Sequence, residues 1–284
     1  MRAYLVLLVA LLTACGSIGG VASSTTVLPP PPSTTKPETP VDPGLGCPQI
    51  GDFVDRGRVM RQDQPESDTA IVGLIAWELS QGCERFVIEF ETTEGAPATT
   101  PPSVIVEFLE TRQVIRIHLN ADRTVITDQI VETDLVDRLF VVRALDTGSF
   151  VDLHLRLPAQ ARVRVSNSPA RLIIELQAGL EDFAGQAAVS DASVVTNPFD
   201  GAEGPTNIEV SGYARTAEGS VLIIATSGDQ VVADATTDVA ESEETWGEFK
   251  TRIDVPSGET SIFVGEEDPS DGSLAGVTVK MLNR

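Results

Sequence analysis

Residues 84–90 read Glu-Arg-Phe-Val-Ile-Glu-Phe, and the pattern of this stretch predicts the fold class. Charged side chains and bulky apolar side chains alternate along it, so that in an extended chain each kind would face its own side. A period of two is typical of a β-strand that turns one face toward a core and the other toward water. We therefore expect the chain to build its core from strands.

The same period recurs along the chain after this stretch. In residues 150–157 the apolar Val151, Leu153 and Leu155 alternate with polar side chains. One helix is predicted near residues 133–139, where an acidic residue is placed to cap its first turn. Residues 47–180 are thus predicted to be a mainly β domain. Further strands are expected at residues 103–109, 114–119, 163–165 and 171–176, and the capping residue is Asp134.

Shorter strands and closer turns mark the last part of the chain, residues 197–284. About seven short strands in so short a stretch are typical of an antiparallel sandwich. Residues 181–196 are small and polar, so we expect a linker there and independent motion of the two β domains. The strands are predicted at residues 207–213, 220–225, 230–233, 247–255, 259–264 and 276–282.

The first residues have the layout of an export signal. Arg2 precedes an apolar run over residues 4–12 that is too short to span a membrane, which takes about 20 residues. Residues 12–15 (LTAC) resemble the lipobox of bacterial lipoproteins. That resemblance implies a signal peptide over residues 1–14 and acyl chains, palmitate among them, on Cys15. We expect a lipid-anchored protein at the extracytoplasmic face of the cell membrane; the alternative is a soluble secreted protein.

Residues 15–46 are rich in Ser, Thr, Gly and Pro and poor in charged and aromatic residues. Such a segment buries too little apolar surface to offset the entropy lost on ordering. We predict a disordered, extended tether between the lipid and the first β domain.

The charge balance argues against two classes of partner. The chain has 20 Lys plus Arg against 42 Asp plus Glu, a net charge of -22. This charge repels phosphate backbones, so nucleic acid is not an expected partner, and a bare anionic lipid surface is not either. Solubility explains the acidity; the alternative is cation binding in the wall.

Three cysteines are present, and the lipid would occupy one of them. Cys47 and Cys83 then form an even pair in an oxidising compartment, which predicts a disulfide. The alternative is two unpaired thiols. No Cys-x-x-Cys spacing occurs, so neither a redox motif nor a zinc motif is present.

Two strands of the first domain resemble a known family. Residues 82–90 (GCERFVIEF) and 168–176 (SPARLIIEL) are similar to the hallmark strands of the AMIN-like domain of actinobacterial lipoproteins. That family is akin to the AMIN domain found beside cell-wall amidases and secretins. The resemblance implies a β-sandwich over residues 47–180 and peptidoglycan binding. Residues 102–108 (PSVIVEF) are aliphatic where the family usually has an aromatic side chain.

The second domain resembles another family across nearly its whole length. The motifs are residues 208–214 (IEVSGYA), 218–221 (EGSV), 246–249 (WGEF) and 266–273 (EEDPSDGS). In order and spacing they resemble the immunoglobulin-like domain of bacterial spore-germination lipoproteins. The resemblance implies an immunoglobulin-like sandwich over residues 197–284, without implying a role in germination.

No catalytic motif is legible. The two histidines, His118 and His154, fall in the polar phase of predicted strands, where a surface position is expected. No Gly-x-Ser-x-Gly, His-Glu-x-x-His or phosphate-binding glycine loop occurs. We expect no enzyme, no cofactor and no metal site; a glycosidase-type carboxylate pair brought together only by folding is the alternative.

Two further features have two interpretations each. Asp268, Asp271 and Gly272 have half the spacing of a calcium loop, but the further oxygen ligands of a complete loop are not seen in the sequence, so we interpret them as a β-turn with an acidic rim. Trp246 is expected in the core of the sandwich rather than on the surface as a platform for sugars.

These observations predict a noncatalytic envelope lipoprotein. Its first domain would contact peptidoglycan, and its second would be a module for binding an envelope protein. The alternative is a structural spacer, or an accessory subunit that delivers a separate cell-wall hydrolase.

Overall fold

The structure is all β in the residues that it describes. It is a computed structural model that describes residues 47, 51–80, 82–240, 245–267 and 272–284. The predicted signal peptide, the tether and the predicted lipid site at Cys15 lie outside these residues. Within the described ranges the chain contains no helix. A membrane-crossing helix is therefore not found among them.

Twenty strands are present in the described part of the chain. The first eleven are β1 (Arg58–Gln62), β2 (Ile71–Ser80), β3 (Cys83–Glu91), β4 (Val104–Phe108), β5 (Val114–Leu119), β6 (Arg123–Thr124), β7 (Asp128–Ile130), β8 (Val136–Arg143), β9 (Ser149–Leu155), β10 (Ala159–Ser166) and β11 (Arg171–Ala178). The rest are β12 (Ala188–Val189), β13 (Ser193–Asn197), β14 (Ala202–Gly204), β15 (Asn207–Ala214), β16 (Ser220–Ser227), β17 (Gln230–Asp238), β18 (Trp246–Asp254), β19 (Gly258–Glu267) and β20 (Leu274–Asn283).

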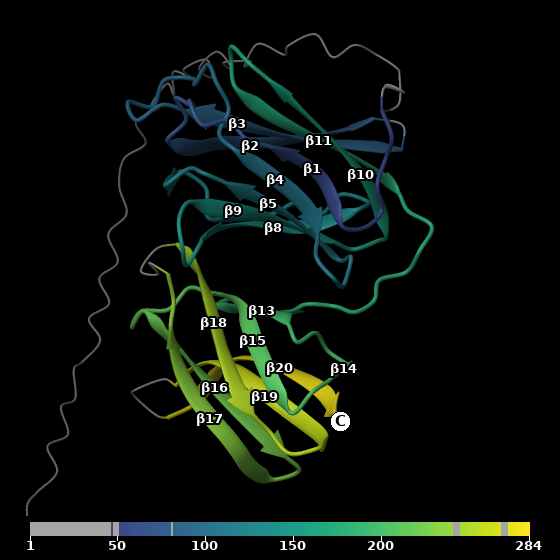
Figure 1. The fold of residues 1–284 in the computed structure, drawn as a ribbon, viewed down its shortest axis with the longest axis vertical. Helices are drawn as coiled ribbons and strands as arrows, with labels where there is room; N and C mark the ends of the chain where they lie inside the picture. The colour runs from purple at the N-terminus through teal and green to yellow at the C-terminus, as the bar shows by residue number, and fades with distance from the viewer. Residues whose placement is uncertain (1–46, 48–50, 81, 241–244, 268–271) are drawn as a thin grey trace, which may run out of the picture. The chain divides into compact units, whose positions relative to one another are not determined.

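Two sheets pack face to face in the first half, which we define as residues 47–180 (Figure 1). One sheet has the order β10-β11-β3-β2-β6, and the other begins β1-β4-β5-β9-β8. The apolar phase of residues 84–90 lies between them: Phe86, Ile88 and Phe90 are buried in the core cluster of this half. The alternation that predicted β3 therefore points its apolar face inward, as expected.

The helix predicted over residues 133–139 is wrong. Strand β8 begins at Val136, and the residues before it form a turn held by Glu84 of β3. The buried Glu84 carboxylate accepts hydrogen bonds from the Thr133 hydroxyl (2.6 Å) and from the Leu135 backbone N–H (2.7 Å). Glu84, which is distant in sequence, thus accepts the hydrogen bonds of polar groups that in a helix would be bonded within the helix itself.

The second half, residues 181–284, is also a sandwich. One sheet has the order β14-β20-β19-β16-β17, and the facing layer is β18-β15-β13-β12. Val210, Ile223, Phe249 and Val264 are buried between them. Strand β12 and most of β13 lie in residues 181–196, the segment for which a linker was expected.

The two halves share one sheet and belong to one compact unit. Strand β18 pairs in parallel with β8, with Trp246 opposite Val142 and Gly247 opposite Arg143. The ten-stranded sheet therefore runs on from β8 into β18. Independent motion of the halves was expected, but this pairing and the apolar cluster described below join them instead.

Candidate functional site

An apolar cluster, here called the junction cluster, joins the two halves. All its members are buried, and several rings meet edge to face, an arrangement that aromatic quadrupoles favour. The ring centroids of Phe140 and Trp246 are 4.9 Å apart, and those of Phe140 and Tyr213 are 5.1 Å apart. The cluster consists of Phe140, Val142 and Phe150 from the first half and Val194, Tyr213 and Trp246 from the second.

Trp246 lies in this cluster with 1% of its surface exposed, so it is a core residue, as expected, and no surface platform. A guanidinium, that of Arg215, lies 5.4 Å from its ring centroid. Because its ring is buried against the first half, Trp246 helps to join the two halves, a role that was not expected for a core residue of the second sandwich.

Three polar residues, Arg116, Asp152 and His154, adjoin the junction cluster. Asp152 accepts two hydrogen bonds from the Arg116 guanidinium, at 2.9 and 2.8 Å. The same guanidinium lies 3.9 Å from the ring centroid of Phe150. On the same face of β9, the His154 Nε2 atom lies 2.5 Å from the Tyr213 hydroxyl, which links the two halves.

Burial sets the charges of these groups. It lowers the pKa of His154 to about 4, so the imidazole is neutral at physiological pH. Burial, followed by the nearby Asp152 carboxylate, raises the pKa of Tyr213. For Arg116, burial opposes the charged form, but the Asp152 carboxylate outweighs it and the pKa is raised. Arg116 therefore stays charged, while His154 and Tyr213 stay neutral.

His154 was predicted at the surface, and that prediction is wrong. Only 3% of it is exposed, because the second half covers the outer face of β9. His118, the other histidine, is on the surface as expected. Its side chain is 42% exposed, and its Nε2 atom lies 3.3 Å from Glu107.

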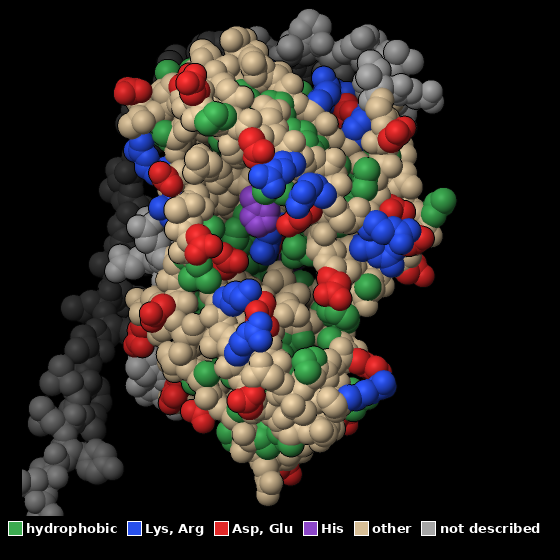
Figure 2. Space-filling view, viewed as in Figure 1, with side chains coloured by type: hydrophobic (Ala, Val, Ile, Leu, Met, Phe, Trp, Pro, Cys, Tyr) green, Lys and Arg blue, Asp and Glu red, His purple; other side chains and the backbone are tan. Residues whose placement is uncertain are grey.

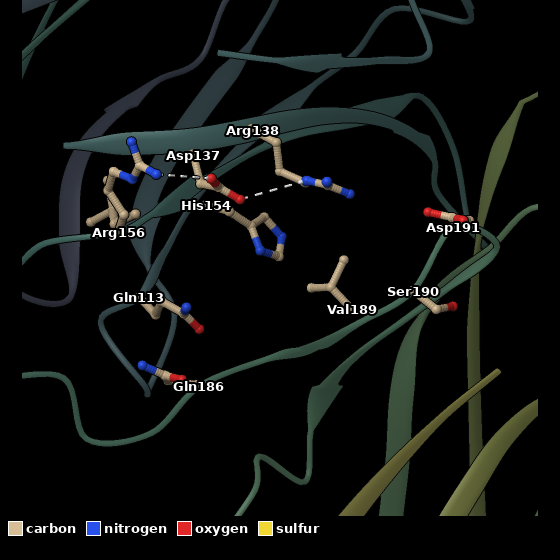
Figure 3. Close-up of a pocket in the computed structure, with 10 residues that line it drawn as sticks. Gln113, Asp137, Arg138, His154, Arg156, Gln186, Val189, Ser190 and Asp191 are labelled. Atoms are coloured by element: carbon tan, nitrogen blue, oxygen red, sulfur yellow. Dashed lines mark ion pairs between the residues drawn. The ribbon is translucent and has the colours of Figure 1, made fainter. Parts of the chain in front are cut away.

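A pocket of about 410 Å³ opens beside His154 (Figure 3). Its first wall comes from β8, from the end of β9 and from the residue before β5, and its second wall from the segment around β12. Asp137 lies 3.7 Å from Arg138 and 3.7 Å from Arg156. The lining residues are Gln113, Asp137, Arg138, His154, Leu155, Arg156, Gln186, Val189, Ser190 and Asp191.

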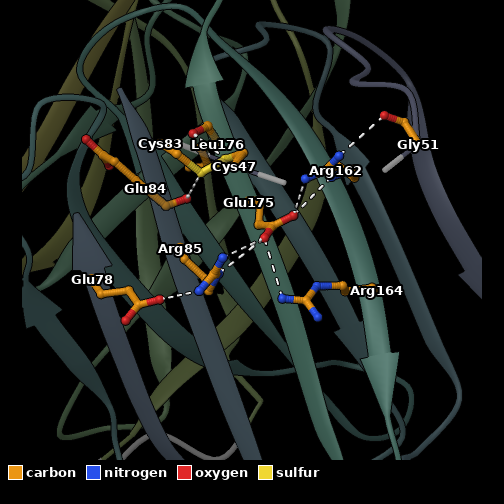
Figure 4. A network of polar contacts seen from close by, with 10 residues as sticks. All are labelled: Cys47, Gly51, Glu78, Cys83, Glu84, Arg85, Arg162, Arg164, Glu175 and Leu176. Atoms are coloured by element: carbon orange, nitrogen blue, oxygen red, sulfur yellow. Dashed lines mark hydrogen bonds and ion pairs between the residues drawn. A yellow bond between two sulfur atoms is a disulfide. The ribbon is translucent and has the colours of Figure 1, made fainter. Parts of the chain in front are cut away.

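A second buried polar cluster stabilises the other sheet (Figure 4). Glu175, 1% exposed on β11, accepts hydrogen bonds from Arg85 of β3 and Arg162 of β10, and Arg164 lies 3.5 Å away. Burial would raise the pKa of Glu175, but the hydrogen bond from Arg162 and the other cations lower it. This cluster ties three strands together, so we assign it a structural role.

The predicted disulfide is present. Cys47 and Cys83 are bonded, with their Cα atoms 5.3 Å apart, and the bond attaches residue 47 to the first residue of β3.

The outer face of β4 and β5 carries a different surface. Ile105 and Glu107 of β4 and Arg116 and His118 of β5 point away from the core on this face. Figure 2 shows one face of the molecule, on which basic and acidic side chains lie beside one another rather than in patches of a single sign. The junction cluster covers the outer face of β8 and β9 and leaves most of this face of β4 and β5 uncovered.

A metal centre would need several ligating side chains close together. No group of three or more His, Cys, Asp or Glu side chains that could hold a metal ion occurs in the described residues. Asp268 and Asp271, half of a possible calcium loop, lie outside the described residues.

Comparison with known families identifies one part of the chain. Residues 193–273 match the family described as the immunoglobulin-like domain of bacterial spore germination. The match begins at Ser193, the first residue of β13. Comparisons with curated proteins and with solved structures find no match. The AMIN-like character of the first half stays a prediction.

Proposed function

We propose that the protein is a noncatalytic, lipid-anchored component of the bacterial cell envelope. In this proposal Cys15 carries the lipid, the first half contacts peptidoglycan, and the immunoglobulin-like second half binds a neighbouring protein. The lipobox-like residues 12–15, the disulfide and the family of residues 193–273 support an exported envelope protein.

The observation that supports wall contact is that the two parts of one sheet differ in how far their outer face is covered. The outer face of β8 and β9 packs against the junction cluster, whereas Ile105, Glu107 and His118 on β4 and β5 are only half-buried. Peptidoglycan presents hydroxyl, amide and carboxylate groups, and a surface of mixed donors, acceptors and apolar side chains suits them. Because Glu107 lies opposite Arg116 and beside His118 on this face, the surface opposes an anionic polymer less than the net charge of -22 suggests.

Co-sedimentation with purified peptidoglycan tests wall contact. The Cys15→Ser chain supplies a form without the lipid, and anchoring through Cys15 predicts that this form leaves the membrane fraction. We expect it to pellet with peptidoglycan, and we expect Ile105→Ser combined with His118→Ser to reduce the pelleted fraction.

The matched control is Leu74→Ser combined with Leu79→Ser. Both leucines are exposed on β2, in the other sheet of the first half, so this variant should pellet as the parent does. Wall contact is refuted if the parent pellets no more than an unrelated protein of similar charge.

That negative result would favour a structural spacer or an accessory subunit that delivers a separate hydrolase. The continuous sheet through β8 and β18 supports this second candidate, because it fixes the two halves to one another and suits a stiff spacer.

A further inference from the structure

The pocket beside the junction cluster contains a buried imidazole with unused hydrogen-bonding capacity. His154 bonds Tyr213 through Nε2, and no residue of the described chain hydrogen-bonds its Nδ1 atom. Figure 3 shows the ring projecting between Gln113, Arg138 and Val189. A buried imidazole normally uses both of its nitrogens. The pocket is therefore where water or a ligand would meet the second nitrogen.

Arg138 offers donors to the same space. Its side chain is 28% exposed, and its Nε atom lies 3.7 Å from Asp137, beyond hydrogen-bonding distance. Its guanidinium lies 5.8 Å from the ring centroid of Phe140, which places it beside the junction cluster. Within the described residues Arg138 donates no hydrogen bond, so most of its five N–H groups remain available.

Gln113 is held in place by the opposite wall. Its Oε1 atom accepts a hydrogen bond from the Ala187 backbone N–H at 2.7 Å, which leaves its amide NH₂ group for the pocket. The second wall is itself ordered, because the Ser190 hydroxyl accepts from the backbone N–H of Ser193 at 3.0 Å. The pocket thus has fixed donors on a built frame rather than mobile side chains alone.

These groups select for one kind of ligand. A guanidinium and an amide NH₂ bind a planar carboxylate well, and the neutral imidazole suits a neighbouring N–H or O–H group. Asp137 and Asp191 also line the pocket, so multiply charged anions such as phosphate esters are disfavoured. We propose that this pocket binds a small monocarboxylate with an adjacent amide, such as the carboxyl end of a short peptide.

The size of the pocket agrees with this class. Its volume of about 410 Å³ lies toward the lower end of the range for small-molecule sites. The proposal does not rest on wall contact, because the pocket and the outer face of β4 and β5 use different residues.

Calorimetric titration of the Cys15→Ser chain with N-acetylglycine tests the proposal. We expect saturable binding in the millimolar range, and binding at least about tenfold weaker for the neutral N-acetylglycinamide, which lacks the carboxylate. Arg138→Gln should weaken N-acetylglycine binding about tenfold. The matched control is Arg61→Gln. Arg61 is an exposed residue of β1 that pairs with Asp63 at 3.2 Å, so this variant should bind N-acetylglycine as the parent does.

A second variant, at Gln113, tests the proposal even if Arg138→Gln impairs folding. Gln113→Glu retains an oxygen that accepts from Ala187 but places a negative charge at the pocket, so it should abolish binding of N-acetylglycine. Nitrogen-15 NMR of the imidazole adds a direct readout, because saturation should shift the His154 Nδ1 resonance.

Three results would each overturn the proposal. They are no saturable binding of N-acetylglycine up to roughly 10 mM, equal binding of the neutral amide, and an unchanged His154 resonance at saturation. The wall experiment can fail while this one succeeds, because a soluble small molecule is the probe.

Discussion

His154 is a neutral histidine in a position where a charged one would be destabilising. It is buried between β9 and Tyr213, and Arg116 lies close enough to disfavour a second positive charge. The neighbouring Asp152 carboxylate favours protonation, but it is already engaged by Arg116 through two hydrogen bonds. Desolvation is therefore the effect that decides the protonation state.

This environment predicts a pH dependence of stability. The unfolded chain takes up the His154 proton below about pH 6.5, whereas the folded chain takes it up only near pH 4. The free energy of unfolding should therefore fall as pH drops from about 6.5 to 4, by about 3 kcal/mol from this group, and no further below that. Urea unfolding of the parent and of His154→Gln between pH 4 and 7 measures the difference.

The comparison with the variant is needed because carboxylates act in the same direction. Hydrogen bonds from the backbone of Thr99 lower the pKa of Asp68, and the Lys250 ammonium lowers that of Glu209, so both groups also lose stabilising interactions in acid. Both residues remain in His154→Gln. His118→Gln is the matched substitution at the exposed histidine. Equal slopes for the parent and His154→Gln would contradict the prediction.

At the scale of elements, β3 is the strand on which the first half depends. It pairs with β2 on one side and β11 on the other, and Glu84 holds the turn before β8. Its first residue, Cys83, carries the disulfide to Cys47. The strand therefore connects the core of the sandwich to the segment that leads back toward the proposed lipid anchor.

Removing the disulfide should destabilise the protein without changing its fold. The two cysteines are 36 residues apart, and closing a loop of that length stabilises a fold by about 4 kcal/mol in the chain-entropy model. Cys47→Ser combined with Cys83→Ser should lower the free energy of unfolding in urea by up to that amount. The reduced parent should show the same loss. Equal stability of the oxidised parent and the double variant would show that the bond contributes nothing.

At the scale of the whole molecule, the junction makes one cooperative structure from two sandwiches. Phe140 and Phe150 would be exposed if the second half left, as would Tyr213 and Trp246 if the first half left. Exposing four aromatic side chains, at about 1.5–3 kcal/mol each, costs an amount comparable to the 5–15 kcal/mol by which domains are normally stable. The halves are therefore expected to unfold together.

Trp246→Ala should break this coupling. Removing a buried tryptophan costs about 3–5 kcal/mol, and here the loss falls on contacts between the halves. Differential scanning calorimetry should show one transition for the parent and two for the variant. Trp77→Ala is the control: Trp77 stacks on Phe86 within the first half, so its loss should lower the transition temperature and keep a single transition. Two transitions in the parent would contradict the idea of a shared core.

Much of the fold was determined by the local pattern of the sequence. Strand β5 spans residues 114–119 as predicted, and the six strands predicted after residue 206 are all present as β15 to β20. A period of two is a local property, because alternate side chains of any extended segment face opposite sides. The disulfide could likewise be predicted from an even pair of cysteines and the expected compartment.

Which polar positions are buried, and how the halves meet, depends on tertiary packing. Asp152 and His154 alternate with apolar residues as surface side chains do, yet both are buried because the second half covers the outer face of β9. The turn at residues 133–135 depends on Glu84, about fifty positions earlier in the sequence. Alternation identifies the face that a strand turns to its own core. It carries no information about a second surface that packs on the opposite face, and the candidate pocket lies there.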